Sequence, residues 1–234
     1  MTDKLRNPRC EGPAPRAVLF DVDGTLVDTN DLHAAAWREA FLNFGLDKPF
    51  EEIRWQIGKG GDNLIPSLFP DLVDTQREEM EAFRSDLFKR DYLPRATPFP
   101  GVRDLFERLA AEGTRIVLAS SSHSEEVDYN LSLIACADLV DATTSSDDVE
   151  KSKPCPDIFE AALAKVAPFG SEEVAVVGDT PWDAEAARKL GLRIVGFRSG
   201  GFPDEALTAA GACELYDGPN DLLARFDSSV FGRD

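Results

Sequence analysis

The chain has 234 residues, of which 43% are hydrophobic, and this is enough apolar sequence to bury a substantial core. Its formal net charge of −18 argues against nucleic acid or an anionic membrane as a partner, because both attract clustered Lys and Arg. Every apolar run is also far shorter than the ~20 residues that a membrane span requires.

The N-terminal segment, residues 1–15, is polar and rich in proline, and it has no apolar stretch. We therefore expect a disordered lead-in and no signal peptide. The four cysteines are scattered without C-x-x-C spacing, and the chain has only two histidines. This pattern does not fit a zinc site, and it is typical of reduced thiols in a cytoplasmic protein.

The first predicted strand, residues 17–20, is an apolar run that ends in two acids, Asp21 and Asp23. Such a run is typical of a buried strand in a parallel sheet, and the carboxyl ends of these strands are where α/β proteins bind ligands. Two carboxylates this close repel each other, and a hard cation such as Mg²⁺ relieves the repulsion. The alternative is an acidic turn, because the Asp-Gly pair that follows is a common turn sequence.

Residues 30–95 show helical patterning without convincing strands, and we expect them to form a small helical bundle outside the sheet. A glycine-rich turn at 56–62 carries Lys59, and Arg54 lies just before it. These two cations are candidates for binding the non-reacting end of a substrate, or they are solvated charges on a flexible connection. His33, on an expected exposed first turn, is a further candidate of the same kind.

The second predicted strand, residues 115–119, ends in serines where the first ends in acids. Ser120, together with the backbone N–H of Ser121, could donate hydrogen bonds to a phosphate. The alternative is an ordinary turn or a cap for the helix that we predict near 124–133.

Lys153 precedes a proline that we expect to open a helix, and a residue before proline is held extended. A lysine held in this way could neutralise both a carboxylate nucleophile and a phosphoryl oxygen. The alternative is a solvated surface lysine, which we expect for the neighbouring Lys151.

A third buried-type strand, residues 174–178, ends in Asp179, and Asp183 follows four residues later. A helix that begins near Pro181 would carry Asp183 in its first turn. A carboxylate there could serve the site or simply cap the helix.

Further strands are predicted at 192–197 and 212–216, alternating with helices. This alternation predicts a doubly wound, Rossmann-like α/β fold with a parallel sheet. The expected organisation is a core domain made of residues 16–29 and 96–234, with an all-α helical cap domain, residues 30–95, inserted into it.

Four segments stand out in chain order between Asp21 and Asp183: D-V-D-G-T, a strand ending in serine, K-P-x-P-D and G-D-x-x-x-D. In this order and spacing they resemble the haloacid dehalogenase superfamily of phosphotransferases, and most of all its phosphoglycolate phosphatase and β-phosphoglucomutase branch. The resemblance covers nearly the whole chain beyond the lead-in. The dehalogenases of this superfamily lack an acid at the position of Asp23. Its presence here therefore disfavours dehalogenation as the activity that the resemblance implies.

The resemblance implies that Asp21 is the nucleophile that takes the phosphoryl group and that Asp23 is the general acid and base. For that role the pKa of Asp23 is expected to rise from an ordinary value of about 3.9. Ser120 and Lys153 would hold the phosphoryl oxygens.

The implied cofactor is Mg²⁺, held by a carboxylate oxygen of Asp21, the backbone carbonyl of Asp23 and the carboxylate of Asp179. Asp183 would lie beside the metal-bound waters. His33 resembles a histidine near the start of the cap in the phosphoglucomutase branch.

The expected activity is that of a Mg²⁺-dependent phosphatase acting on a small phosphorylated metabolite through an aspartyl-phosphate. A phosphosugar mutase of the β-phosphoglucomutase type is the alternative, and a non-catalytic regulator with the same fold is a third. We expect a monomer or homodimer.

Overall fold

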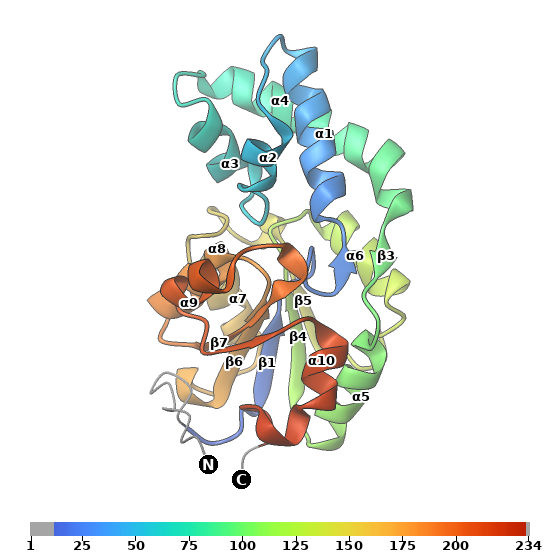
Figure 1. Cartoon of the computed structure of the whole chain (residues 1–234), viewed down its shortest axis with the longest axis vertical. Helices are drawn as coiled ribbons and strands as arrows, with labels where there is room; N and C mark the ends of the chain where they lie inside the picture. Colours follow the sequence, from blue (N-terminus) through green and yellow to red (C-terminus); the bar gives the residue numbers. More distant parts are fainter. Residues whose placement is uncertain (1–11, 233–234) are drawn as a thin grey trace.

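The computed structural model describes residues 12–232 and is built on a six-stranded parallel sheet (Figure 1). The strands, in the order in which they lie side by side, are β5 (Ala142–Thr144), β4 (Arg115–Ala119), β1 (Ala17–Phe20), β6 (Val174–Gly178), β7 (Arg193–Phe197) and β8 (Glu214–Tyr216). This arrangement confirms the predicted α/β fold class. Most of the predicted lead-in, residues 1–15, lies outside the described residues.

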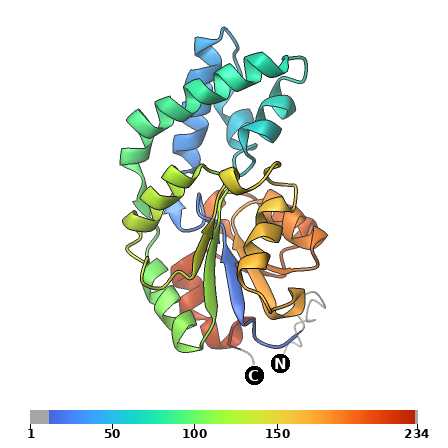
Figure 2. The same ribbon diagram turned by 180° about the vertical axis from the view of Figure 1, so that it is seen from behind.

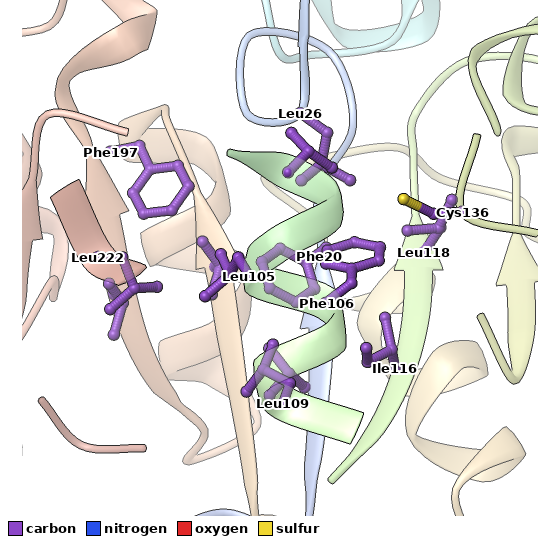
Figure 3. Close-up of a cluster of buried hydrophobic side chains, with 14 of the residues drawn as sticks. Phe20, Leu26, Leu105, Phe106, Leu109, Ile116, Leu118, Cys136, Phe197 and Leu222 are labelled. Carbon is purple, nitrogen blue, oxygen red and sulfur yellow. The ribbon is translucent and has the colours of Figure 1, made fainter. Parts of the chain in front are cut away.

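Alternate side chains of β1 supply the two cores of the sheet, as a strand covered on both faces requires. Val18 and Phe20 pack in the layer that contains α5 (Val102–Ala111) and α10 (Pro219–Ala224). Figure 3 shows this core, in which the rings of Phe20 and Phe106 lie 4.9 Å apart between centroids.

Ala17 and Leu19 pack in the opposite layer, which contains α7 (Asp157–Lys165) and α8 (Pro181–Lys189) and appears from behind in Figure 2. The small residues of α8 allow this helix to lie close to the sheet. Because both faces are covered, β1 is fixed rigidly and the residues that follow it are held in place.

A helical segment lies between two short strands, β2 (Val27–Asp28) and β3 (Thr97–Pro98), that pair with each other. Its helices are α1 (Asn30–Asn43), α2 (Phe50–Arg54), α3 (Gly61–Leu68) and α4 (Asp74–Leu87), and a π-helical turn (Phe88–Tyr92) continues the last. Side chains from all four helices form a separate hydrophobic core. Figure 1 shows this segment standing over the carboxyl ends of the strands.

Several details differ from the sequence-based expectations, among them the starts of β7 and β8, which begin one and two residues later than predicted. Strand β5 and the β2–β3 pair were not predicted, because each contains three residues or fewer. Helix α7 begins at Asp157, three residues beyond the proline that was expected to open it. Helix α6 (Ser124–Leu133) and strand β4 have the predicted bounds, and α9 (Asp204–Ala210) follows β7.

In residues 12–232 we find no helix with both the length and the apolar character needed to cross a membrane.

Candidate active site

Three neighbouring strands bring the polar residues of the site to one edge of the sheet. Asp21 follows β1, Ser120 follows β4 and Asp179 follows β6, and these strands lie side by side with β1 in the centre. Because parallel strands present their carboxyl ends at the same edge, residues far apart in the sequence meet there. Thr25 joins two of them, since its Oγ1 lies 3.0 Å from both Asp21 Oδ2 and Asp179 Oδ1.

Three buried carboxylates, those of Asp21, Asp179 and Asp183, have oxygens within 4.8 Å of one another. Burial raises the pKa of Asp21 well above its ordinary value, and the three nearby aspartates raise it further against the lowering effect of Lys153. Burial and Asp183 raise the pKa of Asp179 to about 7. Burial and the neighbouring acids thus both oppose ionisation of the cluster, and its all-oxygen donor set fits a hard divalent cation such as Mg²⁺.

Lys153 is the buried counter-charge of this cluster, with only 1% of its surface exposed. Its Nζ contacts Asp21 Oδ1 closely, lies 2.8 Å from Asp183 Oδ1 and donates to the Ala119 carbonyl at 3.1 Å. Burial lowers the pKa of Lys153, but the two carboxylates outweigh it, so the net pKa is raised and the ammonium stays charged. Lys151, by contrast, is exposed as expected.

Asp183 both caps a helix and belongs to the cluster. Its Oδ2 accepts hydrogen bonds from the Thr180 backbone N–H at 3.1 Å and Thr180 Oγ1 at 2.6 Å, while its own N–H donates back to Thr180 Oγ1 at 3.2 Å. This capping box begins α8 and fixes the carboxylate, which leaves Oδ1 for Lys153. The two alternatives for Asp183 are thus compatible.

Asp23 is surrounded by hydrogen-bond donors. Those within 3.3 Å of its carboxylate are Thr29 Oγ1 (2.7 Å), Ser122 Oγ (2.9 Å), His33 Nε2 (3.0 Å) and Ser120 Oγ (3.3 Å). Burial raises the pKa of Asp23, but the charge and hydrogen bond of His33 and the two hydroxyls outweigh it, so the pKa falls below its ordinary value. The expected rise is therefore wrong for this arrangement, because the donors stabilise the carboxylate.

The serines after β4 are placed differently from the expectation. Ser120 is fully buried, and its Oγ contacts Asp23 and accepts from the Ser122 N–H at 3.0 Å. Ser121 lines the cavity, and its buried Oγ has no hydrogen-bond partner in residues 12–232. The hydroxyl that is free to meet a ligand thus belongs to Ser121.

A cavity lies between the helical segment and the strand ends. Its ionisable lining residues are Asp21, Asp23, His33, Lys59, Glu81, Arg84 and His123. Acidic groups and cations therefore face the same space, with Asp21 and Asp23 on the side of the strand ends and the charged side chains of the helical segment opposite.

The sequence suggested that His33 lies on an exposed turn. In the structure it is instead buried, at 5% exposed, and its ring stacks on Phe88 with centroids 4.0 Å apart. Its Nε2 faces Asp23, and its Nδ1 closely contacts Arg84 Nη2. Helix α1 thus brings the His33 ring into direct contact with Asp23.

Lys59 lines the cavity, but Arg54 is not among the lining residues. Arg54 donates from Nε to Asp31 Oδ1 at 2.6 Å and from Nη2 to the Gly200 carbonyl at 2.7 Å, so its guanidinium joins the helical segment to the loop after β7. Arg54 was a candidate for binding substrate on sequence grounds, but its side chain does not line the cavity. The Lys59 ammonium lies 4.0 Å from the centroid of the Trp182 ring.

Sequence reasoning did not find several residues of the site. Glu81 and Arg84 lie three residues apart on α4, which is the spacing of one helix face, but the surrounding charges of that helix mask the signal. Asn30 donates to Asp179 Oδ2 at 2.7 Å and lies where a side chain on Gly24 would collide. Gly24 has a φ of +79°, so glycine meets both the steric and the backbone requirement there.

The comparisons with known proteins agree with this geometry. The model of the haloacid dehalogenase-like hydrolase family matches residues 18–197. The chain is 31% identical over 219 residues to a phosphoglycolate phosphatase of Cereibacter sphaeroides strain ATCC 17029, covering 89% of this chain and 97% of that protein. It is 30% identical over 215 residues to a phosphorylated carbohydrates phosphatase of Thermotoga maritima, covering 88% and 96%.

A crystal structure of a hydrolase from Pseudomonas syringae superposes with a TM-score of 0.86 at 31% identity and covers 92% of this chain and 99% of that one. The similarity to relatives thus extends over both the sheet and the helical segment.

Proposed function

The chain belongs to the haloacid dehalogenase-like hydrolase family and is a phosphatase of that family, and from this we propose that it hydrolyses a small phosphomonoester with Mg²⁺ through an aspartyl-phosphate. The observation that carries the proposal is the buried group of Asp21, Asp179, Asp183 and Lys153. A carboxylate next to a buried ammonium and two further acids suits the transfer of a phosphoryl dianion.

In the proposed first half-reaction, an oxygen of Asp21 forms a bond to phosphorus while the bond from phosphorus to the alkoxide breaks. Lys153 and the free hydroxyl of Ser121 would donate to the phosphoryl oxygens, with the backbone N–H of Ser121 beside them. Bound Mg²⁺, held by Asp21, Asp179 and the carbonyl of Asp23, would supply positive charge against the phosphoryl oxygens.

Asp23 would give a proton to the leaving alkoxide and then take one from the water that hydrolyses the aspartyl-phosphate. The hydrogen bonds around Asp23 favour its ionised form, which is the form that the second half-reaction needs. In the first half-reaction, the approaching phosphate dianion would raise the pKa of Asp23 by repulsion and so favour its protonated form.

We propose that residues 30–95 act as a cap domain over a core of 16–29 and 96–234. Closure of the helical segment over the cavity would exclude water from the reacting phosphoryl group. Lys59, Glu81 and Arg84, which face the cavity from the cap, would contact the non-reacting end of the substrate.

A phosphosugar mutase is the alternative, and the contact between His33 and Asp23 is the observation that favours it. A side chain of the cap that holds the general acid and base could keep water from the phosphoenzyme. The same Asp21 and Asp23 would then return the phosphate to a sugar instead of releasing it.

The test is phosphate release from a panel that includes phosphoglycolate and sugar phosphates, with Mg²⁺ and with EDTA. A parallel assay follows conversion of β-glucose 1-phosphate with a bisphosphate primer. Metal-dependent phosphate release supports the proposal, isomerisation without release replaces it with the mutase, and inactivity in both assays with every compound favours a non-catalytic regulator.

A further inference from the structure

The turn that links α2 to α3 docks onto two loops of the core. We call residues 58–63, which are the end of this turn and the first residues of α3, the cap turn; Figure 1 shows the connection reaching down from the helical segment toward the sheet. It meets Ser152, which immediately precedes Lys153, and Thr180, which precedes α8. The cap turn therefore contacts the loop that carries Lys153 and the N-cap residue of the helix that carries Asp183.

Ser152 is the centre of a dense set of hydrogen bonds with the cap turn, and only 6% of its surface is exposed. Its N–H donates to Asp62 Oδ2 at 3.1 Å, its Oγ contacts Asp62 Oδ1 closely, and its Oγ accepts from the Gly60 N–H at 2.9 Å. Asn63 Nδ2 donates to the Ser152 carbonyl at 3.0 Å and lies 3.4 Å from the carbonyl of Lys153 itself.

Two glycines of the cap turn allow this close approach. A Cβ on Gly60 would lie 2.6 Å from the Cβ and Oγ of Ser152, and a Cβ on Gly58 would lie 2.7 Å from Thr180 Cγ2. Both distances are shorter than real contacts. Neither position tolerates a side chain without moving the cap turn off the core, so glycine is needed for docking at both, and Gly58, with a φ of +98°, needs it for the turn as well.

We propose that Asp62 and Asn63 are positioning residues that hold the loop of Ser152, so that closure of the cap places Lys153 against Asp21. The proposal rests on the proposed function, because it assigns Lys153 to the phosphoryl site. It explains why five hydrogen bonds, counting one from Asn63 Nδ2 to Ser152 Oγ at 3.1 Å, join the cap turn to the residue that precedes the buried lysine.

Asp62 is suited to a test because it is exposed to solvent, so its replacement should not disturb a core. In Asp62→Ala both carboxylate oxygens are lost, and a displaced Lys153 would stabilise the transition state less well. We expect kcat to fall roughly 10- to 100-fold with KM changed much less. The matched control is Asp71→Ala, which removes an exposed acid of the same segment that has no hydrogen bond or ion pair in residues 12–232.

A double-mutant cycle separates positioning from a general structural effect. If Asp62 acts through Lys153, Asp62→Ala should cost nothing further in the Lys153→Ala background. An equal loss in both backgrounds would overturn the proposal. It would also be overturned if Asp62→Ala had the same kcat as the control Asp71→Ala. Ser152→Ala, which keeps the backbone groups but loses the hydroxyl, should show the same non-additivity with a smaller loss.

Hydrogen exchange tests the docking without turnover. The Ser152 amide donates to Asp62, so peptides spanning residues 149–153 should exchange faster in Asp62→Ala than in Asp71→Ala. Unchanged exchange would contradict the contact even in an active enzyme. If the wild-type protein hydrolyses nothing but exchange responds as expected, the proposed function fails while the docking stands.

Discussion

The buried acid–lysine cluster, which reaches the cavity through Asp21, and the cavity wall opposite it are held in place in different ways. The acid–lysine cluster, which consists of Asp21, Lys153, Asp179 and Asp183, is at most 6% exposed and is fixed by strand ends, a capping box and mutual ion pairs. The cap wall, by which we mean Lys59, Glu81 and Arg84, comes from helices and a turn of a segment with its own hydrophobic core. The cluster is thus determined by the sheet, whereas the wall depends on how the cap docks.

This difference implies that changes in the cluster should abolish turnover, whereas changes in the cap wall should alter substrate preference. The cluster is also electrostatically unfavourable in the absence of a metal ion. Buried acids with raised pKa values are costly to keep ionised without a cation.

The largest expected effect is that of Asp21→Asn, which removes the proposed nucleophile. We expect phosphate release to fall by roughly four orders of magnitude or more. The fold should persist, and metal-free stability should not decrease, because one of the mutually repelling buried acids is gone while Lys153 keeps its ion pair with Asp183. Steady-state phosphate release and thermal unfolding measure the two effects. Asp28→Asn, an exposed acid close by, is the control, and turnover within tenfold of wild type in Asp21→Asn would refute the nucleophile assignment.

The next effect compares the two lysines of the site. Lys153→Ala leaves Asp21 and Asp183 without their counter-charge, and removing one partner of a buried ion pair costs about 3–5 kcal/mol of stability. We expect this loss together with a fall in kcat, measured by denaturant unfolding and by kinetics.

Lys59→Ala should cost little stability, because Lys59 forms no ion pair in the described chain and is only partly buried. It should change KM more than kcat. A loss of stability in Lys59→Ala as large as that in Lys153→Ala would show that the cluster and the cap wall are not held differently.

The sequence was sufficient to predict the cluster because each of its members follows a recognisable local signal. An apolar run that ends in an acid is visible for β1 and β6, and the proline after Lys153 marks its loop. Sheet topology then brings these positions together, since parallel strands share one ligand-binding edge. Long strands with continuous burial carry most of the predictable fold, whereas β5, with only three residues and partial burial, gives no such signal.

The cap wall could not be predicted in the same way, because it depends on long-range docking. Arg54 and Lys59 are close in sequence and both cationic, yet one bridges to Gly200 and the other lines the cavity. The pKa of Asp23 was predicted in the wrong direction for a similar reason. Its donors are Thr29 just before α1, His33 in α1 and the serines after β4, and no local pattern shows that they converge on it.

A smaller effect concerns the pH dependence of metal binding. The pKa of Asp179 is raised to about 7 in the folded protein, so the metal-free fold holds a proton that the unfolded chain releases near pH 4. Metal-free stability should therefore fall as the pH rises from about 4 to 7 and level off above that.

Because Mg²⁺ needs the ionised carboxylate, its affinity should rise by up to roughly tenfold between pH 6 and pH 8. Calorimetric titration with Mg²⁺ at the two pH values, with proton release measured in two buffers, checks this. Asp179→Asn should bind more weakly and lose most of the pH dependence. An affinity for Mg²⁺ that is the same at both pH values in the wild type would contradict the role of Asp179 as a ligand that must lose a proton.

The smallest expected effect is that of Glu81→Gln in the cap wall, and it concerns which substrate is preferred. Burial raises the pKa of Glu81, and the charge of Asp62 raises it further, whereas His123 and Arg84 lower it by a smaller amount. Its carboxylate faces the cavity and has no hydrogen bond or ion pair within residues 12–232, so it is available to a ligand. It should accept hydrogen bonds from substrate hydroxyls and repel a substrate carboxylate.

Glu81→Gln should therefore raise KM for a sugar phosphate and lower it for phosphoglycolate. Each change should be about three- to tenfold, because a hydrogen bond to a charged group is worth about 1.5–3 kcal/mol when buried and less at this partly exposed position. The control is Glu78→Gln, an exposed acid one turn earlier on α4. KM values that shift in the same direction for both substrates would show that Glu81 affects the packing of the cap and not the selection of the substrate.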